Sequence, residues 1–403
     1  MSLHSKTPAE APFPEPMFRL QHYSNMAPRL PLLRTSASSA SSSRESSLPH
    51  AYILLSGLGD TLGTLPYIPR LANHLASRGG WELLLPTLSS TGGGWGTSSL
   101  EGDARELCEL ITSLRREEED VEAQRRHPAG GSDTRPKRHI VIHGHSTGCQ
   151  DLVQLLSESR SAPDGVPIPS LPESARPTSS PIAPISAAIF QAPVSDCEDF
   201  QDRVVSAAKI GHPSSKQAVE MLKLATEMVE QGRGNELLPR SHVAVLKPEH
   251  GPAAWSYGSG EGGGDAPVAA DPISNAPVTA YRHHSLHASG GDDDFFSSAR
   301  TLTDDALRKG RLARAIANAE ESGTTKLLFL FSAQDEYVPP DLRKDADTVF
   351  LKRWEGLQSD RGREMGTVRG HVIDGAGHAV RDVKAQIKML EHIDELLDRV
   401  ERS

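Results

Sequence analysis

One serine in the chain lies in a pattern typical of an activated nucleophile. Residues 144–148 read Gly-His-Ser-Thr-Gly, with Ser146 at the centre, and they follow directly on the largely apolar run at 139–143. This spacing predicts a short buried strand, a sharp turn that lifts the Ser146 hydroxyl above a sheet, and a helix that begins at about Thr147. Glycines suit the two flanking positions because a Cβ atom there would clash where the backbone approaches itself closely.

A serine hydroxyl is a weak nucleophile by itself, so a base and an acid must come from elsewhere in the chain. The candidate base is His378, which ends the glycine-containing stretch 374–378 behind the last predicted strand. The candidate acid is Asp335, shortly after the preceding predicted strand, and Asp196 behind an earlier strand is the alternative acid. The order Ser146, Asp335, His378 is the order found in α/β-hydrolases. In such a triad the histidine takes the serine proton and the acid fixes the histidine tautomer.

Attack on an ester also requires two donors for the developing oxyanion. One predicted donor is the backbone amide of Thr147, directly after the nucleophile. The second is expected in the loop behind the first strong strand, at Leu58 or Gly59, where small residues allow the backbone to approach a substrate.

Other residues near these motifs have simpler interpretations. Cys149 fits a packed small residue on the inner turn of a helix better than a second nucleophile. Trp95 suits either the wall of a pocket or a partly buried structural position. His283, His284 and His287 fall in a stretch with little periodicity, so we expect them to be solvated.

Hydrophobic patterning predicts strands that alternate with helices. Continuous apolar runs predict strands at 51–55, 81–88, 139–143, 185–191, 326–331 and 367–373. Amphipathic spacing predicts helices at 66–76, 98–116, 147–157, 217–230 and 381–400. Two shorter pieces, 17–20 and 30–33, are candidates for additional first strands. The alternation predicts a mostly parallel central sheet with helices on both of its faces. Together with the order of Ser146, Asp335 and His378, it predicts an α/β-hydrolase fold.

The same patterning divides the chain into regions. We expect residues 1–50 to form a flexible segment rich in Ser and Pro, and residues 51–403 to form one hydrolase domain. The alternation stops at about 197–323, which enters at the sheet edge that carries the serine and is therefore predicted to form a lid. Loops of low complexity are expected at about 160–184 and 249–294.

Composition excludes several classes of partner. The 403-residue chain has a formal net charge of −10, which argues against binding to nucleic acid or to an anionic membrane. Its 3 cysteines, Cys108, Cys149 and Cys197, lack C-x-x-C spacing, which disfavours a disulfide framework or a zinc site and favours a reducing compartment. No apolar run approaches the length of a membrane span. We therefore expect a cytoplasmic protein that acts on a small molecule.

Five motifs together resemble a mainly fungal family of α/β-hydrolases that is catalogued as a domain of unknown function. The motifs lie at 57–60, 94–100, 144–151, 191–196 and 335–339. Some members of that family are intracellular siderophore esterases. The resemblance implies a cytoplasmic serine hydrolase that needs no metal and no organic cofactor, with any iron arriving as part of the substrate.

These observations predict a serine esterase that works through an acyl-enzyme, with a siderophore-type ester as one specific candidate substrate. A protein of this fold that binds a small ligand without catalysis is an alternative from another class. An acyltransferase that passes the acyl group to an alcohol or amine is a third interpretation.

Overall fold

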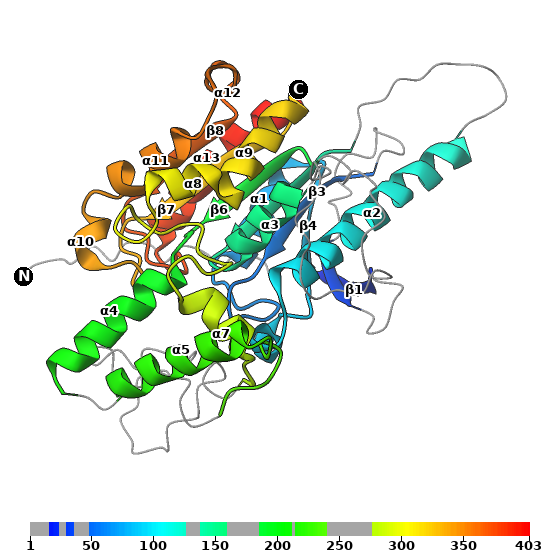
Figure 1. Ribbon diagram of the computed structural model, residues 1–403. Coiled ribbons are helices and arrows are strands. Elements are labelled where there is room, and N and C mark those ends of the chain that lie inside the picture. The colour runs from blue at the N-terminus through cyan, green and yellow to red at the C-terminus, as the bar shows by residue number, and fades with distance from the viewer. Residues whose placement is uncertain are drawn as a thin grey trace, which may run out of the picture.

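A central eight-stranded sheet organises the protein (Figure 1). The computed structural model describes residues 16–23, 30–35, 48–125, 138–158, 185–211, 214–239 and 276–403. The strands are β1 (Phe18–His22), β2 (Pro31–Thr35), β3 (His50–Leu55), β4 (Trp81–Pro86), β5 (Ile140–His145), β6 (Ala187–Gln191), β7 (Lys326–Ser332) and β8 (Val368–Ile373). They lie in the order β1-β2-β4-β3-β5-β6-β7-β8.

The sheet is mostly parallel, as the sequence predicts. Strands β3 to β8 pair in parallel, whereas β2 pairs antiparallel with both β1 and β4. All six strands expected from apolar runs are confirmed, and so are the two short candidates near the N-terminus. The prediction of a flexible segment over residues 1–50 is therefore wrong for Phe18–His22 and Pro31–Thr35, which pair with the central sheet. Because the carboxyl ends of parallel strands share one edge, the segments that follow β3, β5, β6, β7 and β8 converge there.

Helices cover both faces of the sheet. One face carries α2 (Leu100–Arg125), α3 (Gly148–Glu158) and α9 (Arg311–Ser322), and the other carries α1 (Ile68–Arg78) and α13 (Val383–Glu401). In β3, Ile53 packs on the first face and Leu54 on the second, so both faces of this strand are buried. Burial on two faces explains why its sequence is continuously apolar rather than alternating. Within the described ranges, each helix is too short or too polar to cross a lipid bilayer.

Helix α2 is longer than its sequence pattern predicts. The amphipathic pattern ends at residue 116, but the helix continues to Arg125. Glu117 accepts hydrogen bonds from Arg34 of β2 at 2.9 Å and from Arg138 at 3.2 Å, which anchors the polar extension to the sheet. The ion pairs join segments far apart in sequence, so a local pattern could not report them.

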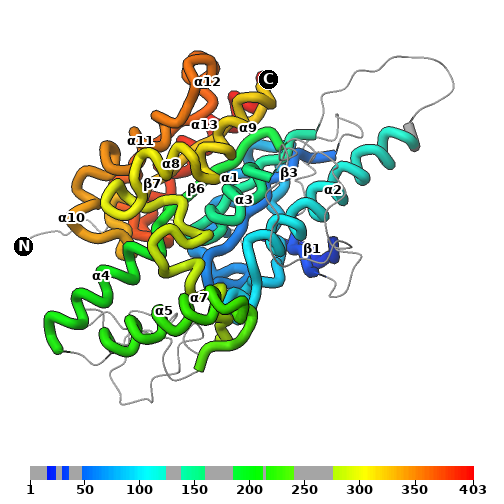
Figure 2. The backbone as a smooth tube through the Cα atoms, in the orientation of Figure 1, coloured from blue at the N-terminus to red at the C-terminus, as the bar shows by residue number. Residues whose placement is uncertain are grey.

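Three helices form a cap beside the strand ends. Helices α4 (Asp196–Lys209), α5 (Ser214–Glu230) and α7 (Ala280–His287) contact one another and gather below the sheet layers in Figures 1 and 2. We refer to these three helices as the cap. Helices α5 and α7, together with Leu238 from the chain between them, form a small core made by Met221, Ala225, Met228, Leu238 and Ala280.

The helices in the rest of the expected lid region pack against the sheet instead of joining the cap. Helices α8 (Asp304–Lys309) and α9 contribute to the same hydrophobic core as α2 and α3. Between β7 and β8 lie four short helical segments, α10 (Pro340–Arg343), the π-helix η5 (Asp347–Leu351), α11 (Lys352–Glu355) and α12 (Asp360–Met365).

The expected loop at 249–294 needs a correction, because its described part contains α7. The Thr279 side chain caps this helix by accepting a hydrogen bond from the backbone amide of Arg282 at 3.2 Å. The expected loop at 160–184 and residues 249–275 lie outside the described residues.

Candidate active site

Ser146 sits in a strained turn between β5 and α3. Its backbone has φ 54, a left-handed conformation that residues other than glycine rarely adopt. A Cβ atom on Gly144 would lie 2.3 Å from the carbonyl oxygen of Gly148, and one on Gly148 would lie 3.0 Å from that of Ser56. Both flanking glycines are therefore required by close backbone approach, and the turn has the geometry of a nucleophile elbow.

The loop behind β3 passes directly against the serine. A Cβ atom on Gly57 would lie 2.8 Å from the Cβ of Ser146, so no larger residue fits there. Asp60 holds the loop in shape by accepting a hydrogen bond from the Gly57 amide at 3.1 Å. This contact brings the backbone of 57–60 close to Ser146.

A pocket opens between this loop and the elbow. Its volume is about 420 Å³, part of it open to solvent, and both Leu58 and Thr147 line it. Among the described residues, no hydrogen bond is donated by the backbone amides of Leu58 or Thr147. Two amides without partners at the wall of one pocket suit the stabilisation of an oxyanion. Gly59 has φ 74 and supports the turn, but it does not line the pocket.

His378 and Asp335 form a buried pair at the same edge of the sheet. His378 Nδ1 lies 3.0 Å from Asp335 Oδ1 and 2.9 Å from Oδ2, and the two side chains follow β8 and β7. His378 is 8 % exposed and Asp335 is 1 % exposed, while Ser146 is 8 % exposed. The backbone amide of His378 also donates to Glu336 Oε2 at 2.8 Å, which fixes the loop that carries the imidazole.

The charge of this pair acts on the imidazole. Burial alone would lower the pKa of His378, but the negative charge of Asp335 and its hydrogen bond outweigh burial and raise that pKa above its ordinary value of 6.5. The nearby Glu336 raises the same pKa further. A stabilised imidazolium is what a general base needs after it has taken a proton.

This electrostatic arrangement predicts a pH dependence. Only the neutral imidazole of His378 can accept a proton, so kcat/KM should fall on the acid side with an apparent pKa above 6.5. Replacing Glu336 by Gln removes one charge that raises this pKa, and we expect the acid limb to move to lower pH. Rate profiles of both proteins on one ester check this. A limb that stays in place or moves upward would contradict the expected electrostatics.

Asp196, the alternative acid, is not bonded to His378. It begins α4, and its Oδ2 accepts a hydrogen bond from Gln150 Nε2 at 3.1 Å. Burial, together with the charge of Asp293, raises the pKa of Asp196 to about 7. Of the two acids that the sequence offers, Asp335 is the one in contact with the imidazole, and Asp196 joins the cap to α3.

Gln191 contacts both His145 and His378. It was not among the site residues predicted from the sequence. Its Oε1 lies 2.5 Å from Nδ1 of His145, and its Nε2 donates to the carbonyl oxygen of His378 at 3.3 Å. The rings of His145 and His378 are 4.8 Å apart. A polar residue at the end of the otherwise apolar strand β6 was the available signal, because such a position faces the sheet edge.

The comparisons with known proteins agree with this architecture. The family described as "Protein of unknown function (DUF1749)" matches residues 32–401. The chain belongs to the DUF1749 family. It is 29% identical over 349 residues to an esterase of Emericella nidulans, covering 82% of this chain and 80% of that protein. It is 27% identical over 352 residues to the fusarinine C esterase of Aspergillus fumigatus, covering 82% of this chain and 83% of that protein.

Solved structures that superimpose on the DUF1749 chain show its fold. The siderophore hydrolase EstB of Aspergillus fumigatus superimposes with a TM-score of 0.66 at 23% identity, covering 98% of this chain and 100% of that one. An α/β-hydrolase fold protein of unknown function superimposes with a TM-score of 0.51 at 14% identity, covering 97% and 98%. These similarities show the α/β-hydrolase fold that the sequence predicts.

Three buried charged residues, Asp103, Asp151 and Arg282, line the pocket in this DUF1749 chain. Arg282 of α7 forms an ion pair with Asp293, and its Nε donates to the carbonyl oxygen of Trp95 at 3.1 Å. Burial, opposed by the charge of Arg282, raises the pKa of Asp103 to about 7. Burial and the charge of Asp103 raise the pKa of Asp151 as well. Arg282 thus joins helix α7 of the cap to the loop that carries Trp95.

Removing Arg282 should destabilise the fold strongly. In Arg282→Met, Asp293 keeps its burial but loses its positive partner, and breaking such a pair costs about 3–5 kcal/mol. The control is Arg300→Met, which breaks an exposed pair with Asp341 and should cost less than about 1 kcal/mol. Urea unfolding measures both free energies. Equal losses in the two variants would show that the buried ion pair does not stabilise the fold.

The histidines of α7 need a correction, because we expected them to be solvated. His283 is 2% exposed, and its ring lies 4.5 Å from that of His287, against Phe200 of the cap. Burial lowers the pKa of His283 to about 4. His284 is half-buried, and its Nδ1 lies 3.1 Å from Thr226 Oγ1. The histidine-rich stretch therefore packs inside the cap.

Proposed function

We propose that the chain is a serine esterase, a carboxylic-ester hydrolase that works through an acyl-enzyme intermediate. Ser146 is its nucleophile, His378 its general base and Asp335 its acid. The observation that carries the proposal is the strained elbow at Ser146, on the sheet edge where His378 and Asp335 are paired. The two relatives named esterases in the same family support ester hydrolysis.

The proposed reaction proceeds in two balanced steps. Ser146 Oγ attacks the ester carbonyl while His378 Nε2 takes the hydroxyl proton, and the alcohol leaves with that proton. Water then attacks the acyl-enzyme, again giving a proton to His378, and the acid is released with Ser146 restored. The amides of Thr147 and Leu58 are the proposed oxyanion donors, because both line the pocket without other partners.

A siderophore-type ester is the proposed specific substrate. Support comes from the relative named fusarinine C esterase, which aligns over most of both chains. In this proposal iron enters only as part of the substrate, and neither step involves a metal bound by the protein.

Product analysis tests the proposed function. The protein is incubated with fusarinine C and with p-nitrophenyl butyrate, and acid and alcohol are quantified by mass spectrometry. We expect equal amounts of acid and alcohol, because water is the acyl acceptor. A shortfall of acid would indicate transfer to another acceptor, and no turnover of either ester by the folded protein would contradict the proposal.

We also propose a cytoplasmic location. All three cysteines of the chain are free thiols, and Cys149 and Cys197 are buried. Free thiols in a chain of this size are typical of a reducing compartment.

A further inference from the structure

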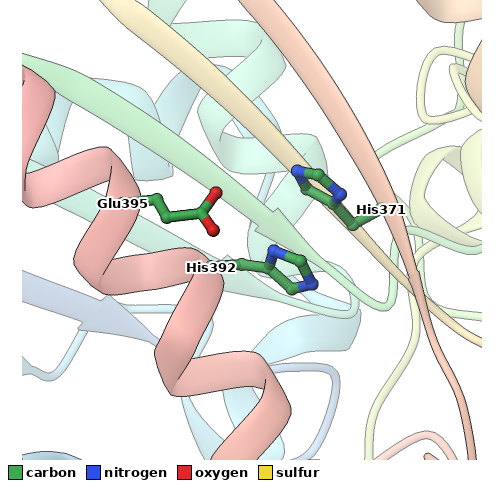
Figure 3. Close-up of side chains that lie close together, drawn as sticks. All are labelled: His371, His392 and Glu395. Carbon is green, nitrogen blue, oxygen red and sulfur yellow. The ribbon is translucent and has the colours of Figure 1, made fainter.

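Two histidines and a glutamate meet on the face of the sheet covered by α13. His371 lies on β8, and His392 and Glu395 lie one turn apart on α13 (Figure 3). One ligand atom from each of the three side chains lies within 4.8 Å of the others. In Figure 3 the carboxylate of Glu395 points toward the two imidazole rings. None of the three residues belongs to the proposed catalytic machinery.

The surroundings of both imidazoles are suited to metal binding. Burial, followed by the effect of His392, lowers the pKa of His371 below its ordinary value, and burial also lowers that of His392. A lowered pKa favours the neutral form of an imidazole, which is the form that binds metals. Nδ1 of His392 is buried and has no hydrogen-bond partner among the described residues. A buried nitrogen without a partner calls for an explanation, and a bound metal would provide one.

The rings are stacked, with centroids 3.9 Å apart and planes 13° apart. A metal ion must lie in the plane of each imidazole that it binds, so one ring has to turn before both can coordinate it. The last torsion of a histidine side chain is broad, and such a turn is inexpensive. Glu395 is exposed, so its carboxylate can follow the metal.

We propose that His371, His392 and Glu395 bind one transition-metal dication of the zinc class. Two imidazoles and a carboxylate are a common zinc set, and they leave a fourth position open to water. Magnesium and calcium prefer all-oxygen sites and fit this set poorly. The positive charges of Arg369 and Lys388 lie nearby, but Lys388 is paired with Glu391 at 2.8 Å.

The position of the site gives it a structural consequence. Strand β8 and helix α13 are joined by the loop at 374–382, which carries His378. A metal bound between His371 and His392 joins the two elements on either side of that loop. Metal binding therefore stabilises the folded chain, since the site is not formed when the chain unfolds.

Zinc titration of the full chain tests the site. The metal-free protein is titrated with Zn²⁺ by calorimetry, and its melting temperature is measured with and without the ion. We expect one tight site per chain and a higher melting temperature with zinc. His392→Phe keeps an aromatic ring for stacking but removes a ligand, and it should weaken binding by roughly 100-fold or more, because even outer-shell changes cost 10–100-fold.

Two further variants keep the test decisive. Glu395→Gln preserves the shape of an exposed side chain and should also weaken zinc binding, which covers the case that His392→Phe fails to fold. His74→Asn is the matched control. His74 Nε2 lies 2.8 Å from Oδ1 of Asp394, which also belongs to α13, but this histidine is not part of the proposed metal site. It should bind zinc as the wild type does. Equal affinity in the wild type, His392→Phe and Glu395→Gln, or no zinc binding by the wild type, would overturn the proposal.

Discussion

Replacing Ser146 by Ala should reduce kcat for ester hydrolysis by roughly 10⁶-fold, the loss seen when a serine nucleophile is removed from a triad. The change deletes one oxygen atom, and the alanine methyl group is no larger than the serine side chain. The φ of 54 at this position is unfavourable for alanine as it is for serine, so the turn keeps its strain. Steady-state hydrolysis of a chromogenic ester measures the effect.

The control for this variant is a serine of helix α3, which begins just after Ser146. Ser157 lies at the far end of α3, where its Oγ donates to the carbonyl oxygen of Gln154 at 3.0 Å. Ser157→Ala should leave kcat within roughly tenfold, because one neutral hydrogen bond contributes about 1 kcal/mol. A Ser146→Ala protein with substantial residual activity would show that the nucleophile lies elsewhere.

Replacing Asp335 by Asn should reduce kcat by roughly 10⁴-fold, the loss known for the same change in a serine protease triad. The amide keeps the shape of the carboxylate but cannot stabilise the imidazolium, and it favours the wrong tautomer of His378. His378 Nδ1 contacts both carboxylate oxygens of Asp335 at 2.9–3.0 Å, so the substitution acts directly on the ring.

Asp196→Asn is the matched comparison, because both acids are candidates by sequence. The pKa of Asp196 is raised to about 7, so part of its population is already neutral at pH 7 and resembles the amide. Its hydrogen bond to Gln150 is one neutral-type contact, and we expect kcat to change by less than roughly tenfold. A larger loss in Asp196→Asn than in Asp335→Asn would transfer the role of the acid to Asp196.

The central elements of the fold and the elbow could be predicted because their signals are local. The strands around β5 are buried on two faces, which makes each of them a continuous apolar run. The pattern at 144–148 has a steric explanation, because a Cβ atom on either glycine would clash with neighbouring backbone atoms. The order of Asp335 and His378 then follows from the parallel topology, which brings successive strand ends to one edge.

Features that depend on contacts between distant segments could not be predicted. Helix α7 lies in a stretch without clear periodicity, and its place depends on the ion pair of Arg282 with Asp293 and on the Trp95 carbonyl oxygen. The burial of His283 follows from the packing of α7 inside the cap. His371 and His392 are 21 positions apart in sequence, and only the packing of α13 on β8 stacks them.

The most direct test of the account is covalent labelling by a fluorophosphonate probe, with the modified residue identified by mass spectrometry of peptides. If Ser146 is the activated nucleophile, the wild type gains one phosphonyl group per chain on Ser146. Ser146→Ala is not labelled, and labelling is much slower when His378 is replaced by Ala. Both a bulky and a small probe are used, so that exclusion by the cap is recognised. Folded wild-type protein that neither probe labels, or that is labelled elsewhere, would contradict the assignment of Ser146 as an activated nucleophile.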